Sequence, residues 1–265
     1  QQAINNNASL DPIFSDENLG DLTLHYTSPF APENNPCGLV GALPVGNDGS
    51  RYVYGDGSTD YPTIQAALDA AQPFDSIVLA GPYSFQGEGN RGVVINKQGI
   101  QLVSQYGTAW IDGESLLGSR GLTIAADDVV ISGVGIRNCE AEEGTDGAGI
   151  LIQACSPVLN DVQITGCTML DGNGNGGGLA IISGNPTING GRISWCQGGV
   201  GGGAYVSSDS NPQFHSVYFS NNWAFLGGGV FSLGPNTVFT DCTFSWCRAS
   251  TRGGGIRLGD GVATI

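Results

Sequence analysis

A repeat of 25 to 29 residues in the second half constrains the fold of this chain more than any other feature. Runs of glycine lead into an apolar residue, and five such junctions follow one another at that spacing: Gly149-Ile150, Gly178-Leu179, Gly203-Ala204, Gly229-Val230 and Gly255-Ile256. Two apolar columns share the period, Ile131, Leu159, Ile188, Phe214 and Phe239, and Ile136, Ile164, Ile193, Phe219 and Phe244. A period of this length is typical of solenoids.

Alternating residues within each repeat predict strands. Val217-Tyr-Phe219 and Ala204-Tyr-Val206 alternate apolar and polar side chains, which is the strand period. Turn-forming GNP, SNP and GPN segments separate such stretches. We therefore predict an all-β fold, a parallel β-helix, whose successive coils pair at about 4.8 Å. We expect Asn222 to bond the backbone of neighbouring coils and Gly227–Gly229 to form a tight corner.

The first half of the chain predicts a cap for this solenoid. Residues 62–72 read as a helix with Pro62 in the first turn. Its apolar face comprises Ile64, Ala67, Leu68 and Ala71. We expect the β-helix to span 47–265, with regular repeats over about 129–265, and residues 1–46 to form a separate, Pro- and Asn-rich tail.

Charge and hydropathy limit the partners of the chain. The chain has nine Lys and Arg residues and 24 Asp and Glu residues, so its net charge is −15. Nucleic acid, an anionic membrane surface and, without a bridging metal, an anionic polysaccharide are therefore disfavoured as partners. We find neither an apolar run long enough to span a membrane nor a signal peptide, and we expect a mature or excised piece of a longer protein.

Seven cysteines include a column at the repeat period, which comprises Cys139, Cys167, Cys196 and Cys247, with Asn222 in the same series. Stacked coils would bring these thiols close enough for a disulfide in principle. Cysteine is also a small buried apolar residue, and an interior ladder is the interpretation we favour.

Three stretches resemble known proteins. DYPTIQAALDAAQPFDSIVLAGPYSFQGEGNRGVVI resembles the capped start of right-handed parallel β-helix proteins of the pectin-lyase-like superfamily. The repeats FSNN…GGGVF and GGGIRL resemble those of chlamydial polymorphic outer-membrane proteins. Residues 9–46 resemble the closing coil of such a domain. The resemblance implies right-handedness, as the crossover rule does, but no single activity, because such proteins include lyases, esterases and adhesins.

A segment that resembles the end of a β-helix domain, residues 9–46, thus precedes one that resembles the start of such a domain. Either the chain is an excerpt from tandem β-helix domains, or residues 1–46 close the open end of another copy, which would produce head-to-tail filaments.

Two acidic loops are candidates for a calcium site. Asp171-Gly-Asn173-Gly-Asn175-Gly resembles the first half of an EF-hand-type loop, although Ile182 occupies the position of its bidentate glutamate. The preceding coil carries a second acidic loop that stacking would place beside it. The alternative is a solvated turn. The predicted ligands are Asp171, Asn173, Asn175, Glu142, Glu143 and Asp146.

Outward-facing columns are the candidates for ligand binding, because solenoids bind along their faces. One column places Tyr205, Phe231 and Arg257 on successive coils, and another contains Arg192 and Tyr218. These aromatic and Arg side chains would stack a sugar or hold a protein, unless neighbouring loops cover them.

Together these patterns and resemblances predict an extracellular or cell-surface scaffold that binds glycan or protein, with calcium as its one candidate cofactor. The resemblances imply a bacterial origin. The alternative is a lyase or esterase that acts on polysaccharide. We assign no catalytic residue and regard enzymatic activity as the weaker hypothesis. Paired acids beside Arg91, Lys97 or Arg120 would favour the enzyme.

Overall fold

The computed structural model describes residues 14–16, 21–24, 50–55, 61–80, 84–142, 144–170, 173–259 and 262–264. The chain forms two compact units, Gln1–Ser50 and Arg51–Ile265. In the first unit, β1 (Phe14–Asp16) and β2 (Asp21–Leu24) pair as antiparallel strands. Most of the tail predicted over residues 1–46 lies outside the described residues, so its likeness to a closing coil stays a prediction.

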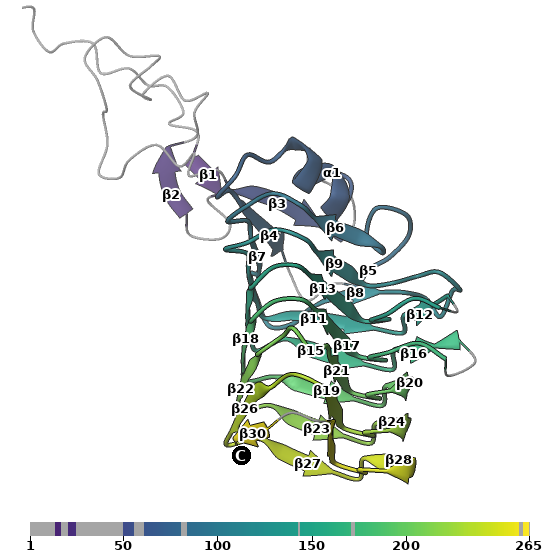
Figure 1. The fold of residues 1–265 in the computed structure, drawn as a ribbon. Coiled ribbons are helices and arrows are strands. Elements are labelled where there is room, and N and C mark those ends of the chain that lie inside the picture. Colours follow the sequence, from purple (N-terminus) through teal and green to yellow (C-terminus); the bar gives the residue numbers. More distant parts are fainter. Residues whose placement is uncertain are drawn as a thin grey trace, which may run out of the picture. The chain divides into compact units, whose positions relative to one another are not determined.

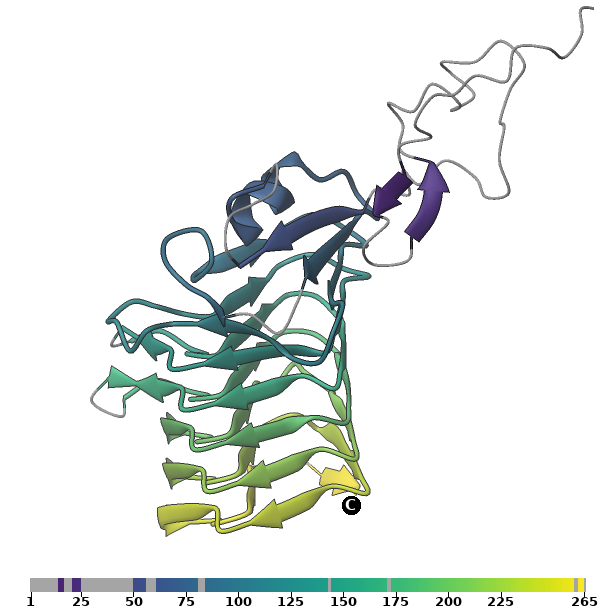
Figure 2. The same cartoon turned by 180° about the vertical axis from the view of Figure 1, so that it is seen from behind.

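The second unit is a parallel β-helix, as predicted (Figure 1 and Figure 2). From residue 130 onward the chain passes through sheets 1 to 4 in turn and returns to sheet 1 one strand further along, whereas the earlier coils have no strand in sheet 3. Sheet 1 has nine strands: β3 (Arg51–Tyr54), β4 (Ser76–Ala80), β7 (Gln101–Ser104), β10 (Val130–Ser132), β14 (Val158–Asn160), β18 (Thr187–Asn189), β22 (Gln213–His215), β26 (Asn236–Thr240) and β30 (Val262–Thr264).

The other three sheets are also parallel. Sheet 2 comprises β5 (Ser84–Phe85), β8 (Ala109–Asp112), β11 (Val134–Arg137), β15 (Gln163–Thr165), β19 (Arg192–Ser194), β23 (Tyr218–Ser220) and β27 (Thr243–Ser245). Sheet 3 comprises β12 (Glu140–Ala141), β16 (Thr168–Met169), β20 (Gln197–Val200), β24 (Trp223–Leu226) and β28 (Arg248–Arg252). Sheet 4 comprises β6 (Val93–Ile95), β9 (Leu122–Ile124), β13 (Ile150–Gln153), β17 (Leu179–Ile182), β21 (Ala204–Val206), β25 (Val230–Ser232) and β29 (Ile256–Leu258).

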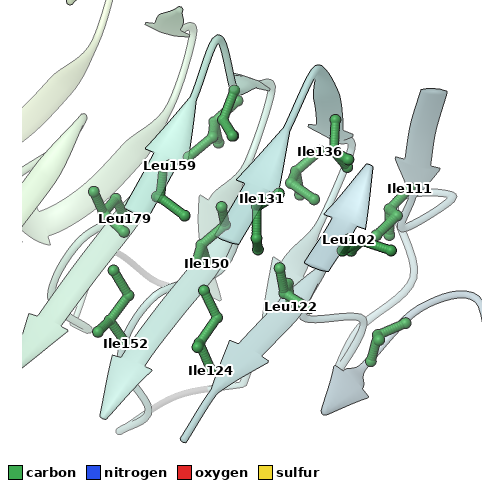
Figure 3. Close-up of a cluster of buried hydrophobic side chains, with 14 of the residues drawn as sticks. Leu102, Ile111, Leu122, Ile124, Ile131, Ile136, Ile150, Ile152, Leu159 and Leu179 are labelled. Carbon is green, nitrogen blue, oxygen red and sulfur yellow. The ribbon is translucent and has the colours of Figure 1, made fainter. Parts of the chain in front are cut away.

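The two apolar columns predicted from the repeat are confirmed, because their members pair in register across sheets 1 and 2. Figure 3 shows side chains of sheets 1, 2 and 4 gathered between the sheets. Both columns continue upstream of residue 129, to Ile77 and Phe85. The stacked core therefore begins in coils whose sequence does not show the repeat. The repeat is hard to recognise there because these coils have no strand in sheet 3, which starts only at β12.

The core changes from aliphatic to aromatic towards the last coils. Phe219 stacks on Phe244 with ring centroids 4.8 Å apart, and Phe214 stacks on Phe239 at 5.2 Å. The two stacks meet edge to face, at 5.8 Å between Phe214 and Phe219. Parallel in-register stacking places like residues on one another, so one aromatic ring in a coil favours another in the next.

The capping helix α1 (Ile64–Ala70) is shorter than predicted. Thr63 is its N-cap, and the Thr63 hydroxyl accepts the N–H of Ala66 at 3.1 Å. Pro62 therefore precedes the cap, and its predicted place in the first turn was wrong, because the Thr63 hydroxyl caps a helix that begins at Ile64. The predicted apolar face is confirmed, since its four residues are buried. At the other end the Lys97 ammonium donates to three backbone carbonyls, those of Leu68, Asp69 and Ala71.

The glycine runs bring two segments of backbone into contact. A Cβ added to Gly202 would lie 2.3 Å from the Trp223 carbonyl, and one on Gly228 would lie 2.3 Å from that of Arg248. Each run thus packs against the sheet 3 strand of the next coil with no side chain between them. Gly227 also has a positive φ of 64°, as expected for a tight corner.

The cysteine column is an interior ladder, as favoured from the sequence. Cys139, Cys167 and Cys196 are buried and Cys247 is half-buried. All six cysteines in the described part of the chain carry free thiols, and Cys37 lies outside it.

Candidate ligand-binding surface

The predicted column of Tyr205, Phe231 and Arg257 exists, but glycine runs cover part of it. The three residues lie in register on sheet 4, and the Tyr205 and Phe231 rings stack at 6.1 Å. All three side chains are half-buried, and burial raises the pKa of Tyr205. A Cβ on Gly227 would lie 2.7 Å from Phe231 Cβ, and one on Gly253 would lie 2.6 Å from Arg257 Cβ. The three side chains are therefore partly covered, and ligand binding by this column stays a prediction.

The second predicted pair, Arg192 and Tyr218, lies on the outer face of sheet 2. The two residues are register partners, and the guanidinium carbon of Arg192 lies 4.5 Å from the centroid of the Tyr218 ring. Arg192 is exposed and Tyr218 half-buried. The ring already holds a cation in a cation–π contact, so ligand binding here would engage the arginine rather than the ring face.

Sequence reasoning missed three exposed tryptophans. Trp195, Trp223 and Trp246 are 65%, 41% and 73% exposed, and they come from three successive coils. Trp195 and Trp246 occupy the same turn between sheets 2 and 3, and Trp223 begins the sheet 3 strand of the coil between them. The fourth tryptophan, Trp110, differs, because it packs under the Arg137 guanidinium at 5.4 Å.

Two of these tryptophans have a left-handed backbone, with φ of 56° at Trp195 and 57° at Trp246. Other coils fill the same turn position with Asn138, Gly166 and Asn221, residue types that adopt this conformation readily. A tryptophan in this region is rare, and such residues cluster at functional sites. The position lies between the apolar and cysteine columns, and reading it along the repeat would have revealed the tryptophans.

Two arginines lie in the strand that pairs with the strand of Trp223. Arg248 and Arg252 are exposed, and Arg248 is the register partner of Trp223. Phe225, in the same strand as Trp223, is 56% exposed. Over residues 173–259 there are four arginines and two aspartates, a net charge of +2, whereas the whole chain carries −15. We call this surface the tryptophan edge, and it comprises Trp195, Trp223, Phe225, Trp246, Arg248 and Arg252.

The basic residues of the early coils make structural contacts. Arg91 forms an ion pair with Glu114, and Lys97 bonds the end of α1. Arg120 donates to the carbonyls of Gly147 and Asp146 at 3.0 and 2.9 Å, and burial lowers its pKa while Asp146 opposes the shift. Each of these three groups therefore has a structural partner, and enzymatic activity stays an alternative hypothesis.

Asp112 is a buried carboxylate whose oxygens accept several hydrogen bonds. Its donors include Arg137 Nε at 2.7 Å, the Glu114 N–H at 2.9 Å and Asn138 Nδ2 at 3.2 Å. Burial acts to raise the pKa of Asp112, but these bonds outweigh it and hold the pKa below the ordinary value. Asp112 is therefore an ionised structural group, whereas a general acid needs a raised pKa.

The two candidate calcium loops do lie side by side. Asp146 and Asn175 form a parallel bridge, and Asp146 Oδ1 accepts the Asn175 N–H at 3.2 Å. Glu142 and Asn173 are exposed, whereas Glu143 and Asp171 lie outside the described residues. Within the described part of the chain, no three Asp, Glu, His or Cys side chains come together as a metal site. Calcium binding stays a prediction.

Comparison with known proteins decides the family. The family model for the right-handed beta helix region matches residues 85–245, more than half of the chain. The chain belongs to this right-handed β-helix family. The match agrees with the handedness expected from the sequence, and it spans every coil from β5 to β27.

Neither the curated proteins nor the solved structures include a match to this right-handed β-helix. Among the described residues, the helical segment is too short to cross a membrane.

Proposed function

We propose that this right-handed β-helix is a non-enzymatic scaffold that acts outside the cell and binds glycan through the tryptophan edge. One observation carries the proposal: three successive coils each expose a tryptophan at the same margin of the solenoid. An exposed apolar patch of this kind marks an interaction site on a protein surface. The left-handed backbone at Trp195 and Trp246 costs roughly 1–3 kcal/mol each, which burial does not offset.

A glycan suits this surface better than a protein does. An indole presents a flat apolar face and one N–H donor, which complement the C–H face and the hydroxyl edge of a pyranose ring. Arg248 and Arg252 add donors for hydroxyl or acidic groups beside those faces.

The extracellular or cell-surface location and end-to-end association remain parts of this proposal that rest on the sequence resemblance. The structural contacts of Arg91, Lys97 and Arg120 support the scaffold over the polysaccharide-acting enzyme.

Affinity electrophoresis in gels that contain different soluble polysaccharides tests the proposal. We expect at least one polymer to retard the protein, and Trp223→Ala to weaken that binding by about tenfold or more. Tyr106→Ala, at an aromatic residue that is exposed outside the edge, is the matched control and should bind normally. Mass spectrometry of the polymer should find it uncleaved. Unretarded migration in every gel, or equal loss in the control, would contradict the proposal.

A further inference from the structure

We infer that the ligand is an extended, acidic polysaccharide that lies along the solenoid axis, across the strands, with about one sugar ring for each coil. This inference rests on the proposed function and specifies its ligand. It follows from the spacing of the tryptophans and from the distribution of charge along sheet 3.

The spacing comes from the coils. Trp195, Trp223 and Trp246 belong to consecutive coils, and parallel strands are about 4.8 Å apart, so the outer two lie about 9.6 Å apart along the axis. The advance of one pyranose ring in an extended β-(1→4)-linked chain is close to one such step. A chain of about three rings therefore spans the distance from Trp195 to Trp246 and passes beside Trp223, which lies two residues further along its coil, whereas a chain laid along any one strand meets a single tryptophan.

The net charge of −15 disfavours an acidic polysaccharide over the chain as a whole, but the charge is unevenly distributed along the axis and indicates where such a ligand lies. One register column of sheet 3 runs from an acid to a base: Glu140, Thr168, Gln197, Trp223, Arg248. Arg252, also exposed, lies in the same strand as Arg248. An acidic chain is attracted to the arginine end and repelled at the glutamate end. Charge complementarity therefore limits the bound segment to the coils from Gln197 onward.

Isothermal titration calorimetry with two matched series of oligosaccharides tests this. One series is β-(1→4)-linked glucuronic acid oligomers of two to six rings, and the other is uncharged β-(1→4)-linked glucose oligomers of the same lengths. We expect affinity for the acidic series to rise about tenfold or more from two rings to four, and then to level off. The glucose oligomers should bind more weakly at every length.

Variants divide the two contributions. In Trp195→Ala and in Trp246→Ala, the affinity should level off at a smaller number of sugar rings than in the wild type, because each variant removes a contact at one end of the tryptophan edge. Arg248→Gln with Arg252→Gln should remove the preference for the acidic series and leave the length dependence. All of these side chains are exposed, so melting temperatures should match the wild type, and Tyr106→Ala should change neither property.

Each contrary result has a distinct meaning. Equal affinity for two and six rings, with binding still lost in Trp223→Ala, would overturn the inference and leave the proposed function standing. Equal affinity for the acidic and uncharged series would overturn the acidic ligand. Absence of binding to any glycan would overturn the proposed function as well. Light scattering that shows a dimer which Trp223→Ala dissociates would assign the edge to a second copy and overturn both.

Discussion

Asn222 links two successive coils, because its side-chain Nδ2 donates to the carbonyl of Ile193 at 2.8 Å. Its Oδ1 also accepts the N–H of Cys196 at 2.9 Å, and the side chain is only 1% exposed. Asn222→Ala would leave both backbone groups buried and unpaired. We expect the free energy of unfolding to fall by about 2–5 kcal/mol, since each such group costs about 1–3 kcal/mol. Urea denaturation measures this, and the exposed Gln153→Ala should change little.

The aromatic core of the last coils makes a graded prediction. Phe219 is fully buried and stacks on Phe244, so Phe219→Ala should lower the free energy of unfolding by about 3–5 kcal/mol. Phe219→Ile restores the residue type that the preceding coil has at Ile193, its register partner. We expect Phe219→Ile to lower the free energy of unfolding by less than half as much as Phe219→Ala does. Equal losses in urea denaturation would mean that stacking, and not filled volume, determines the stability of this column.

The repeat made much of this core predictable, because a residue in a parallel β-helix stacks on its counterpart one period away. Ile131 and Ile136 could thus be assigned to interior columns from spacing alone. The early coils were harder to recognise, since they lack the glycine run and sheet 3. The tryptophan edge was not predicted at all. Its turn position alternates between Asn, Gly and Trp, which share a backbone conformation and no side-chain property, so hydropathy alone cannot reveal it.

The glycine runs give a steric prediction. A Cβ at Gly202 would lie 2.3 Å from the Trp223 carbonyl and 2.6 Å from that of Gly228. Gly202→Ala should therefore separate the run from sheet 3, lower the melting temperature and weaken glycan binding through Trp223. Gly255→Ala is the matched control, because its Cβ would meet its nearest atom at 3.5 Å and its backbone has no positive φ. Similar melting temperatures for the two variants would contradict the close packing of the runs.

Asp112 predicts a pH dependence. Hydrogen bonds from Arg137, Asn138 and the Glu114 N–H hold its pKa below that of an unfolded carboxyl, about 4. The unfolded chain therefore takes up this proton first as the pH falls. The stability that Asp112 contributes is complete above about pH 4 and is lost as the pH falls through the folded pKa.

Thermal unfolding of the wild type and Asp112→Asn between pH 7 and pH 3 measures this contribution. We expect the variant to melt lower at pH 7, and the difference between the two proteins to shrink below about pH 4. The comparison cancels the effect of the other carboxyls, whose mutual repulsion in a chain of net charge −15 is relieved by acid. If the difference in melting temperature between the two proteins stayed constant with pH, Asp112 would stabilise the fold through packing and neutral hydrogen bonds and not through its charge.

Asn221 offers a gain-of-function prediction for the tryptophan edge. It occupies the turn position of Trp195 and Trp246 in the coil between them, and its φ of 54° already matches theirs. Asn221→Trp should therefore add an exposed indole in line with the other two, at a cost in stability of up to about 1–3 kcal/mol. We expect calorimetry to show tighter binding of long acidic oligosaccharides and little change for two-ring ones. Asn138→Trp places the same side chain at this turn in the coil of Glu140, where an acidic chain is repelled, and should give no gain. This variant also loses the hydrogen bond from Asn138 to Asp112, so its melting temperature is measured to show that it is folded. Equal gains in the two variants would mean that an added indole binds sugar wherever it lies, and the axial alignment of the ligand would then fail.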